Sequence, residues 1–317
     1  MNASFTARPL TKQRSAATTP QMLALPGIEE SGAAYALASA SALLRGWLRP
    51  HALHAEHAGH YQADFRLTPA LRDRWHAFFR TDATREIPYL FHTSSTTLLA
   101  ARLLADLGLN LRHVTPLRQV VSHVRDTDPL GQVPLQRLEC RLQRVTQLAT
   151  GIVAVVLHST ISDPQGQLLA TQDDHFSVSH LDTALLPELQ RDRNTVSDFA
   201  LLRCREPRIA SPDANIGEWL IGADWGRHFA RLAGALSPAH GSRLMAYLAG
   251  QPAPTLPTAC LRNLLVRQLA DSGLRAERLD ISFCRPVYLN QRITITQRDA
   301  EFEVSDMRGV LLAFGRC

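Results

Sequence analysis

The residues best suited to do chemistry lie in the stretch Gly222–Gly250, and His240 is the first of them. The run Ala233–His240 follows a short amphipathic pattern, Trp225–Leu232, and precedes a second helical pattern, Ser242–Leu248. Histidine has an ordinary pKa close to neutrality, so this side chain is able to exchange protons with a substrate. A histidine that follows a proline at the start of a helix also serves as a hydrogen-bonded cap, and both interpretations stay open.

A second group of candidate residues opens a helical pattern from Cys260 to Asp271. The positive end of a helix lowers the pKa of a thiol, so Cys260 is a candidate nucleophile if His240 lies nearby. A buried and inert cysteine is the favoured interpretation. Arg262 and Arg267 lie on the same helix and are candidate phosphate contacts, although a solvated helix face explains them equally well.

Histidines recur at every third position from His51 to His60. This spacing can place several imidazoles on one helical face, as a metal site or a pH-sensing site would require. The segment contains Glu56 as its single acidic residue, and a solvated linker is the favoured interpretation. The five cysteines form no Cys-x-x-Cys pair, so zinc and redox motifs are absent and no cofactor is predicted.

Composition indicates a folded protein with two domains. The chain has 317 residues, 45% of them hydrophobic, which suits two domains of about 120 to 150 residues. The net charge is +5, and Lys12 is the single lysine among 34 basic residues. Codon bias in a GC-rich gene is the favoured explanation of this arginine excess, although arginine also suits bidentate phosphate contacts.

Features that the sequence lacks exclude two classes of partner and favour one cellular location. The basic residues are dispersed and form no recognised nucleic-acid-binding module, so no nucleic acid is predicted. No stretch approaches the roughly 20 apolar residues that span a bilayer, so no membrane is predicted. Met1–Lys12 has no apolar signal core, and the cysteines are few and widely spaced, so a cytoplasmic location is predicted.

Residues 1–60 are predicted to form an extension with a helix at Ala33–Leu48, and residues 61–180 the first domain. Helices are predicted over Pro69–Arg80, with Thr68 as N-cap, and over Leu98–Leu107, closed by Gly108. The period then changes to that of strands. The predicted strands are Asp64–Leu67, Leu117–Arg125, Leu135–Gln143, Gly151–Ser162 and Leu168–Val178, the last two joined by a turn at Asp163–Gly166.

Residues 181–213 are polar and interrupted by prolines, which predicts a linker before a second domain at 214–317. That domain repeats the order of the first, with a long helix at Cys260–Asp271. Its predicted strands are Gly217–Ile221, Ala276–Phe283, Val287–Gln297, Glu301–Val304 and Val310–Phe314. Two units of similar order therefore form the chain.

The run that ends at His240 resembles the signature of the MaoC-like hydratase/dehydratase family, Ser-Gly-Asp-x-Asn-Pro-x-His. Gly234, Pro238 and His240 are in register with it, whereas Ala235 replaces the aspartate and Ser237 the asparagine. This resemblance implies a hotdog fold that acts on acyl thioesters.

Two further runs carry the same resemblance. Phe283–Leu289 is similar to the family's Phe-x-Arg-Pro-Val-x-Leu run on a core strand, and Ile87–Tyr89 with the strand at Leu117 resembles a degenerate N-terminal repeat. Together these runs cover about residues 60–317 and imply an α+β double hotdog, in which two antiparallel sheets each wrap around a helix.

The resemblance also implies a reaction, in which water links (3R)-hydroxyacyl and trans-2-enoyl thioesters. The family's aspartate and histidine hold that water, and a backbone N–H polarises the thioester carbonyl. His240 then takes the role of acid and base, and Ser237 orients water. Cys260 and Leu261 are expected to supply the oxyanion donor at the helix start. Arg262 is a candidate substrate contact because of its place on the same helix, independently of the resemblance.

The function predicted from the sequence is a hydratase or dehydratase homologue that acts on coenzyme A or acyl-carrier-protein thioesters in fatty-acid or polyketide-type metabolism. Because Ala235 removes the carboxylate, a catalytically inactive pseudoenzyme that binds acyl thioesters or a carrier protein is the alternative. A repurposed cyclase or thioesterase is the third interpretation, and a carboxylate near His240 would favour it. A homodimer or a partner hotdog protein is also compatible with the sequence.

Overall fold

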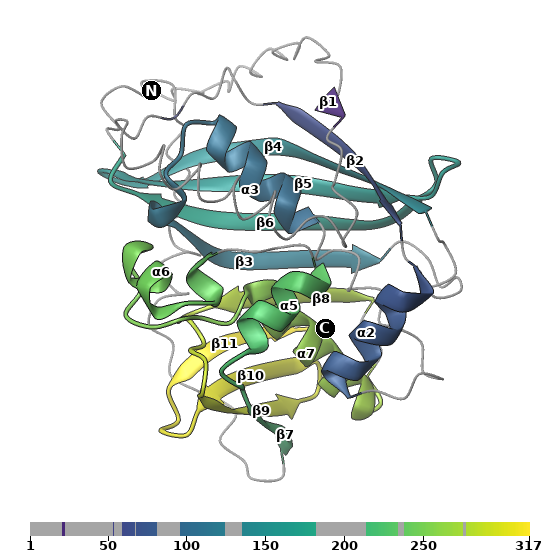
Figure 1. The fold of residues 1–317 in the computed structure, drawn as a ribbon, viewed down its shortest axis with the longest axis vertical. Coiled ribbons are helices and arrows are strands. Elements are labelled where there is room, and N and C mark those ends of the chain that lie inside the picture. Colours follow the sequence, from purple (N-terminus) through teal and green to yellow (C-terminus); the bar gives the residue numbers. More distant parts are fainter. Residues whose placement is uncertain are drawn as a thin grey trace, which may run out of the picture.

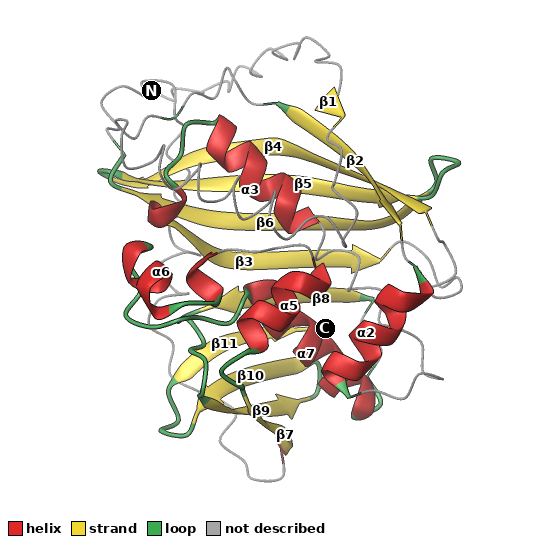
Figure 2. Cartoon of the chain, in the orientation of Figure 1, coloured by secondary structure: helices red, strands yellow, loops and turns green. Residues whose placement is uncertain are grey.

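A computed structural model describes residues 21–22, 53, 59–66, 68–80, 96–123, 135–181, 214–233, 238–274 and 277–317. Figure 2 shows strands forming one continuous sheet, with helices packed against it. The N-terminal half comprises β1 (Gln21–Met22), β2 (His60–Arg66), α2 (Pro69–Phe79), α3 (Thr96–Asp106), the 3-10 helix η3 (Leu111–His113), β3 (Val114–His123), β4 (Leu135–Ala149), β5 (Ile152–Ser162) and β6 (Leu168–Ser179).

The C-terminal half repeats this sequence of elements with additional short helices. It comprises β7 (Asn215–Leu220), α5 (Trp225–Ala233), the 3-10 helix η7 (Pro238–His240), α6 (Arg243–Leu248), α7 (Thr258–Asp271), β8 (Arg278–Phe283), β9 (Arg292–Arg298), β10 (Glu301–Asp306) and β11 (Leu311–Arg316).

The order of strands in the 11-stranded sheet shows that the two halves are built alike (Figure 1). Beyond β1, the N-terminal half has the order β2-β4-β5-β6-β3, and the C-terminal half, read inward from its own edge, has β7-β9-β10-β11-β8. In both halves the long helix, α3 or α7, lies between the first and second strands in the chain. This arrangement is the α+β double hotdog that the resemblance implies.

The two halves meet where β3 pairs with β8 in antiparallel register. Arg118 on β3 spans this junction to Asp280 on β8: its Nε donates to Oδ1 at 2.7 Å and its Nη2 donates to Oδ2. A bidentate pair of this kind fixes both the distance and the angle between its partners. The ion pair therefore helps to fix the register of the central strands.

Helix α7 lies inside the C-terminal half, and nine of its 14 residues are buried, Arg262 and Asn263 among them. Leu264, Leu265 and Leu269 are each at most 1% exposed. Burial of a leucine side chain contributes about 1.5 to 3 kcal/mol, so this helix is a main source of core stability. The N-terminus of the same helix lies at the junction of the two halves.

Several local predictions are confirmed by the hydrogen bonds. Thr68 Oγ1 accepts from the Leu71 N–H at 3.2 Å and caps α2, and Gly108 ends its helix with a φ of 82°. The turn between β5 and β6 closes with the Gly166 N–H donating to the Asp163 carbonyl at 3.0 Å. These motifs depend on residues close together in the sequence.

The prediction of a strand beginning at Val287 is wrong, because β9 begins at Arg292. The Val287 carbonyl accepts from the Leu256 N–H at 2.7 Å, and the Leu289 N–H donates to the Pro254 carbonyl at 3.0 Å. This segment pairs with a loop and not with the sheet, so within Phe283–Leu289 the core strand ends at Phe283.

Several predictions fall on residues outside those described, namely the helix at 33–48, the run 87–89, the linker from residue 182 to 213 and most of the histidine run. His60 is described: it begins β2, and its Nε2 lies 3.4 Å from a Glu139 carboxylate oxygen. The domain boundaries stay predictions.

Candidate functional site

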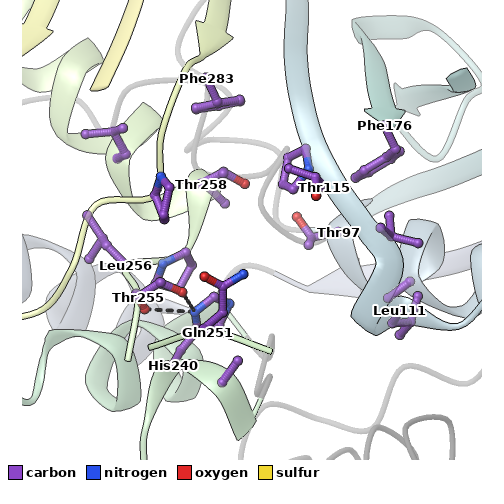
Figure 3. Close-up of a pocket in the computed structure, with 18 of the residues that line it drawn as sticks. Thr97, Leu111, Thr115, Phe176, His240, Gln251, Thr255, Leu256, Thr258 and Phe283 are labelled. Atoms are coloured by element: carbon purple, nitrogen blue, oxygen red, sulfur yellow. Dashed lines mark hydrogen bonds between the residues drawn. The ribbon is translucent and has the colours of Figure 1, made fainter. Parts of the chain in front are cut away.

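A cavity of about 380 Å³ lies between the two halves, which is within the range of about 300 to 1,000 Å³ for small-molecule sites. The N-terminal half contributes residues of α3, η3, β3 and β6 to the walls. The C-terminal half contributes His240, the loop before α7 and the segment 283–287. Figure 3 shows His240, Thr255 and Phe283 facing Thr115 and Phe176 across this space.

The hydrogen bond of His240 determines the protonation of its ring. Nδ1 lies 2.8 Å from the Thr255 carbonyl oxygen and 3.2 Å from the Thr255 Oγ1. A carbonyl oxygen only accepts, so Nδ1 carries the proton and donates it. Nε2 is then unprotonated and has no hydrogen-bond partner within the described part of the chain. The ring therefore lines the cavity as a proton acceptor.

The loop that holds His240 is fixed on both sides. The Thr255 N–H donates to the Ala239 carbonyl at 3.4 Å, and the Leu256 N–H donates to the Val287 carbonyl. The run after Phe283, which carries part of the family resemblance, thus supports the loop whose carbonyl orients His240. The same run also lines the cavity directly, from Phe283 to Val287.

Helix α5 packs against the backbone of His240 at Gly226. A β-carbon at Gly226 would lie 2.9 Å from the His240 carbonyl carbon and nearer still to its oxygen. Only glycine allows this close approach. Gly226 and Thr255 are positioning residues that the sequence analysis missed, because neither belongs to a recognisable motif.

Burial lowers the pKa of His240 to about 4, although the hydrogen bond to Thr255 opposes the shift. Loss of hydration disfavours the charged imidazolium, so the ring is neutral near pH 7. A neutral imidazole with a free Nε2 is able to accept a proton from a water molecule or a substrate. The neutral ring is a poor proton donor. After it accepts a proton, the resulting imidazolium is able to donate that proton.

No carboxylate contacts the His240 ring within the described ranges of the chain. Asp174 on β6 lines the same cavity, but its oxygens accept hydrogen bonds from Gln119 and Gln172, each at 2.6 Å. Ala235 and Ser237 lie outside the described residues, so the predicted role of Ser237 stays a prediction. The structure thus brings a carboxylate into the cavity without pairing it with the histidine.

The prediction that Cys260 and Leu261 supply free backbone donors is wrong. Both N–H groups already donate to the Pro257 carbonyl, at 2.9 and 3.1 Å. The helix begins two residues before Cys260, and the first N–H groups of a helix are those without an intrahelical acceptor. In α7 these belong to Thr258 and Ala259, which line the cavity.

Cys260 is fully buried, and burial raises the pKa of its thiol well above the ordinary value. Its side chain is not part of the cavity wall, which supports the inert interpretation over the nucleophile. The Leu261 side chain does line the cavity and makes this part of the wall apolar.

The phosphate-contact and solvated-face interpretations of Arg262 are both wrong, because its side chain is 0% exposed. Its Nη1 donates to Gln119 Oε1 at 3.2 Å and to Gln172 Oε1 at 3.0 Å. Arg267 is also structural, since it donates to the carbonyls of Phe79 and Arg80 at the end of α2. The sequence around Arg262 gave no signal that this side chain is buried, because its hydrogen-bond partners Gln119 and Gln172 lie far away in the chain.

The described residues hold no group of three or more histidine, cysteine or acidic side chains that would bind a metal ion. Within the same residues, no helix has the length and apolar character to cross a membrane.

No family model matches the chain, and no curated protein matches its sequence. Solved structures do match its fold. HtdX of Mycobacterium tuberculosis aligns with a TM-score of 0.61 and 13% identity over 81% of this chain and 98% of that chain. A MaoC-like dehydratase from Phytophthora capsici aligns with a TM-score of 0.63 and 13% identity over 83% of this chain and 97% of that chain.

A larger protein contains the same fold as one part. The peroxisomal multifunctional enzyme type 2 of Drosophila melanogaster aligns with a TM-score of 0.57 and 15% identity over 81% of this chain and 48% of that chain. Identities this low show the fold alone. The structural neighbours include MaoC-like dehydratases. Their similarity over most of this chain confirms the double hotdog fold.

Proposed function

We propose that this protein is a hotdog protein of the hydratase/dehydratase type, which acts on or binds acyl thioesters. One observation carries the proposal: the neutral His240, with Nε2 unprotonated, lines the same interdomain cavity as the N-terminal residues of α7. Addition of water to an enoyl thioester uses a group that takes a proton from the water and hydrogen-bond donors that stabilise the developing oxyanion, and His240 and the first N–H groups of α7 suit these two roles.

In the forward direction, a water oxygen bonds to the β-carbon of a trans-2-enoyl thioester while His240 Nε2 takes a proton from that water. The electrons of the double bond move toward the thioester oxygen. The Thr258 and Ala259 N–H groups stabilise the developing negative charge, because the positive end of a helix favours an anion. The imidazolium then returns its proton to the α-carbon, which completes the (3R)-hydroxyacyl thioester.

The alternative is a protein that binds acyl thioesters or a carrier protein without converting the thioester, as a pseudoenzyme does. It is supported by Ala235 in place of the family's aspartate and by the absence of a carboxylate partner for His240 among the described residues. The cyclase or thioesterase interpretation has weaker support, because Asp174 shares the cavity but does not contact the His240 ring.

The proposed ligand is an acyl group carried by coenzyme A or an acyl carrier protein, in fatty-acid or polyketide-type metabolism. Arg112 and Arg285 are exposed residues that also line the cavity, so their guanidinium groups suit the phosphates of either carrier. A cytoplasmic location and a homodimer or hotdog partner are proposed with it.

The first experiment is hydration of a short trans-2-enoyl-coenzyme A, followed by loss of enoyl absorbance, with wild type and His240→Ala compared. Turnover in the wild type that falls by about 10² to 10⁴-fold in the variant supports catalysis by His240. No turnover, with thermal stabilisation by an acyl thioester, supports the binding protein. If the wild type shows no turnover and no acyl thioester stabilises it, the catalytic proposal and the binding proposal are both contradicted.

Ala235→Asp tests whether the missing carboxylate limits the reaction. If the variant folds and still binds an acyl thioester, we expect hydration to increase by about 10² to 10⁴-fold. Ala235→Asn is the control, because it adds similar bulk without a proton acceptor. An unchanged rate in Ala235→Asp would reject the idea that this position disables hydration.

A further inference from the structure

A buried polar cluster closes part of the cavity wall, and neither the resemblance nor the proposed reaction uses it. Its members are Gln119 on β3, Gln172 and Asp174 on β6, and Arg262 on α7. They are 5%, 0%, 2% and 0% exposed, respectively. Three come from the N-terminal half and Arg262 comes from the C-terminal half, so the cluster forms only when both halves are in place.

Two glutamines bridge the charged members of the cluster. Arg262 Nη1 donates to the Oε1 atoms of Gln119 and Gln172, at 3.2 and 3.0 Å. The Nε2 atoms of the same glutamines donate to Asp174 Oδ1 and Oδ2, both at 2.6 Å. The sheet register explains this geometry, because Gln119 pairs directly with Asp174 and residues two apart on β6 share a face.

Several donors and acceptors of the cluster have no hydrogen-bond partner in the part of the chain that the structure describes, or can accept a further hydrogen bond. Each glutamine amide has two N–H groups, and Gln119 uses one of them. Each carboxylate oxygen of Asp174 accepts one bond and can accept another. Within the described residues, Arg262 Nε and Nη2 have no hydrogen-bond partner. These two Arg262 atoms lie behind the cavity wall, whereas Gln119 and Asp174 line it. Buried polar groups are almost always paired, so the spare capacity of Gln119 and Asp174 is available to water or to a polar group of a ligand in the cavity.

Two of the four residues of the cluster line the cavity. Gln119 and Asp174 line it, whereas Gln172 and Arg262 lie behind them. The surrounding wall is apolar, with Leu104 and Leu261 among its members. A plain hydrocarbon chain in this cavity would remove Asp174 and Gln119 from water without replacing the lost hydrogen bonds, which is unfavourable.

The remaining capacity defines the ligand group. The spare N–H of Gln119 needs an acceptor, and the spare lone pairs of Asp174 need a donor. A hydroxyl group is both, and it is neutral. The charges of Asp174 and Arg262 are opposite, so the cluster offers no net counter-charge, and burying a charged ligand group beside it would be unfavourable. Burial lowers the pKa of Arg262 to about 10, so the guanidinium stays charged near neutral pH.

We propose that Gln119 and Asp174 form a subsite for a hydroxyl group on the acyl chain, separate from any oxygen that His240 handles. The inference rests on the proposed function, because it takes the occupant of this cavity to be an acyl thioester. The ligand would be an acyl chain with a hydroxyl beyond the carbons that react. The neutral hydroxyl donates to Asp174 and accepts from Gln119.

The test compares the affinity of a medium-length saturated acyl-coenzyme A with chain-matched analogues that each carry one hydroxyl at successive carbons past the β-carbon. Calorimetry measures binding to wild type, Gln119→Met and Gln172→Met. The two variants are matched, because each loses one hydrogen bond to Arg262 and one to Asp174, but only Gln119 lines the cavity.

We expect one analogue to bind wild type at least about tenfold more tightly than the parent chain, the usual scale of a hydrogen bond to a charged group. Gln119→Met should lose that preference and Gln172→Met should keep it. The wild-type comparison tests the subsite even if a variant does not fold.

Each other outcome overturns the proposal in a recognisable way. If the parent chain binds wild type and no analogue binds better, the subsite is wrong and the proposed function stands. If both variants lose the preference equally, the cluster is structural and Gln119 does not contact the ligand. If no thioester binds, both the subsite and the proposed function are wrong.

Discussion

Replacing Gly226 with alanine tests how His240 is held in the cavity wall. In an exposed helix this substitution would add up to about 1 kcal/mol of stability through helix propensity. Here the new β-carbon would lie 2.9 Å from the His240 carbonyl carbon and 3.2 Å from its Cβ. The His240 carbonyl oxygen would be nearer still. Carbon atoms prefer separations of about 3.5 to 4.0 Å, so α5 and η7 must separate by at least about 1 Å.

Overpacking of this kind costs about 1 to 3 kcal/mol, which exceeds the gain in propensity. Because the clash is with backbone atoms, we expect a cost of about 2 to 3 kcal/mol, and subtracting the gain in propensity leaves the variant less stable by about 1 to 2 kcal/mol. A shift of about 1 Å also lengthens the 2.8 Å bond between His240 Nδ1 and the Thr255 carbonyl. If the protein hydrates enoyl thioesters, such a displacement should lower the rate by about 10²-fold.

Urea unfolding and enoyl-thioester turnover or binding would measure the two effects. Gly241→Ala is the matched control, because it adjoins His240 but its β-carbon would meet only the Arg227 side chain, at 2.8 Å. The exposed Arg227 side chain can relieve this contact by rotation about its χ1 bond, which costs less than displacing a backbone segment. Gly226→Ala that is as stable as wild type and binds acyl thioester unchanged would refute the packing argument.

Three further predictions follow from the same contacts. Because the pKa of His240 is lowered from about 6.5 to about 4 on folding, its neutral form contributes stability that is complete above pH 6.5 and is lost as pH falls through 4. The difference in unfolding free energy between wild type and His240→Asn should shrink across that window, and a constant difference would contradict the shift. Asp280→Ala should destabilise the fold by about 1.5 to 3 kcal/mol in urea unfolding, because it removes the bidentate partner of Arg118 at the β3–β8 junction; a loss near zero would show that the strands hold their register without it. Iodoacetamide followed by mass spectrometry should modify the partly exposed Cys284 in the native protein and leave the buried Cys260 unmodified, and early modification of Cys260 would revive the nucleophile interpretation.

Much of the fold was predictable because its signals are local. Thr68 caps the helix that follows it, and the turn at Asp163–Gly166 joins two strands that pair with each other. The repeated order of helix and strands predicted two similar units, and the strand order confirms them. The strand prediction at Val287 was wrong because a loop far along the chain, at Pro254–Leu256, takes its hydrogen bonds.

The sequence by itself determined the caps, the turns and the repeated order of elements, since these depend on neighbouring residues. Its resemblance to a family implied the hotdog fold and His240 as the candidate acid or base. Only the tertiary structure decided which atoms surround the cavity. Arg262 looked like a surface residue until Gln119, 143 positions away, proved to be its partner. Contacts over such separations depend on how the two halves pack, and no local pattern records that packing.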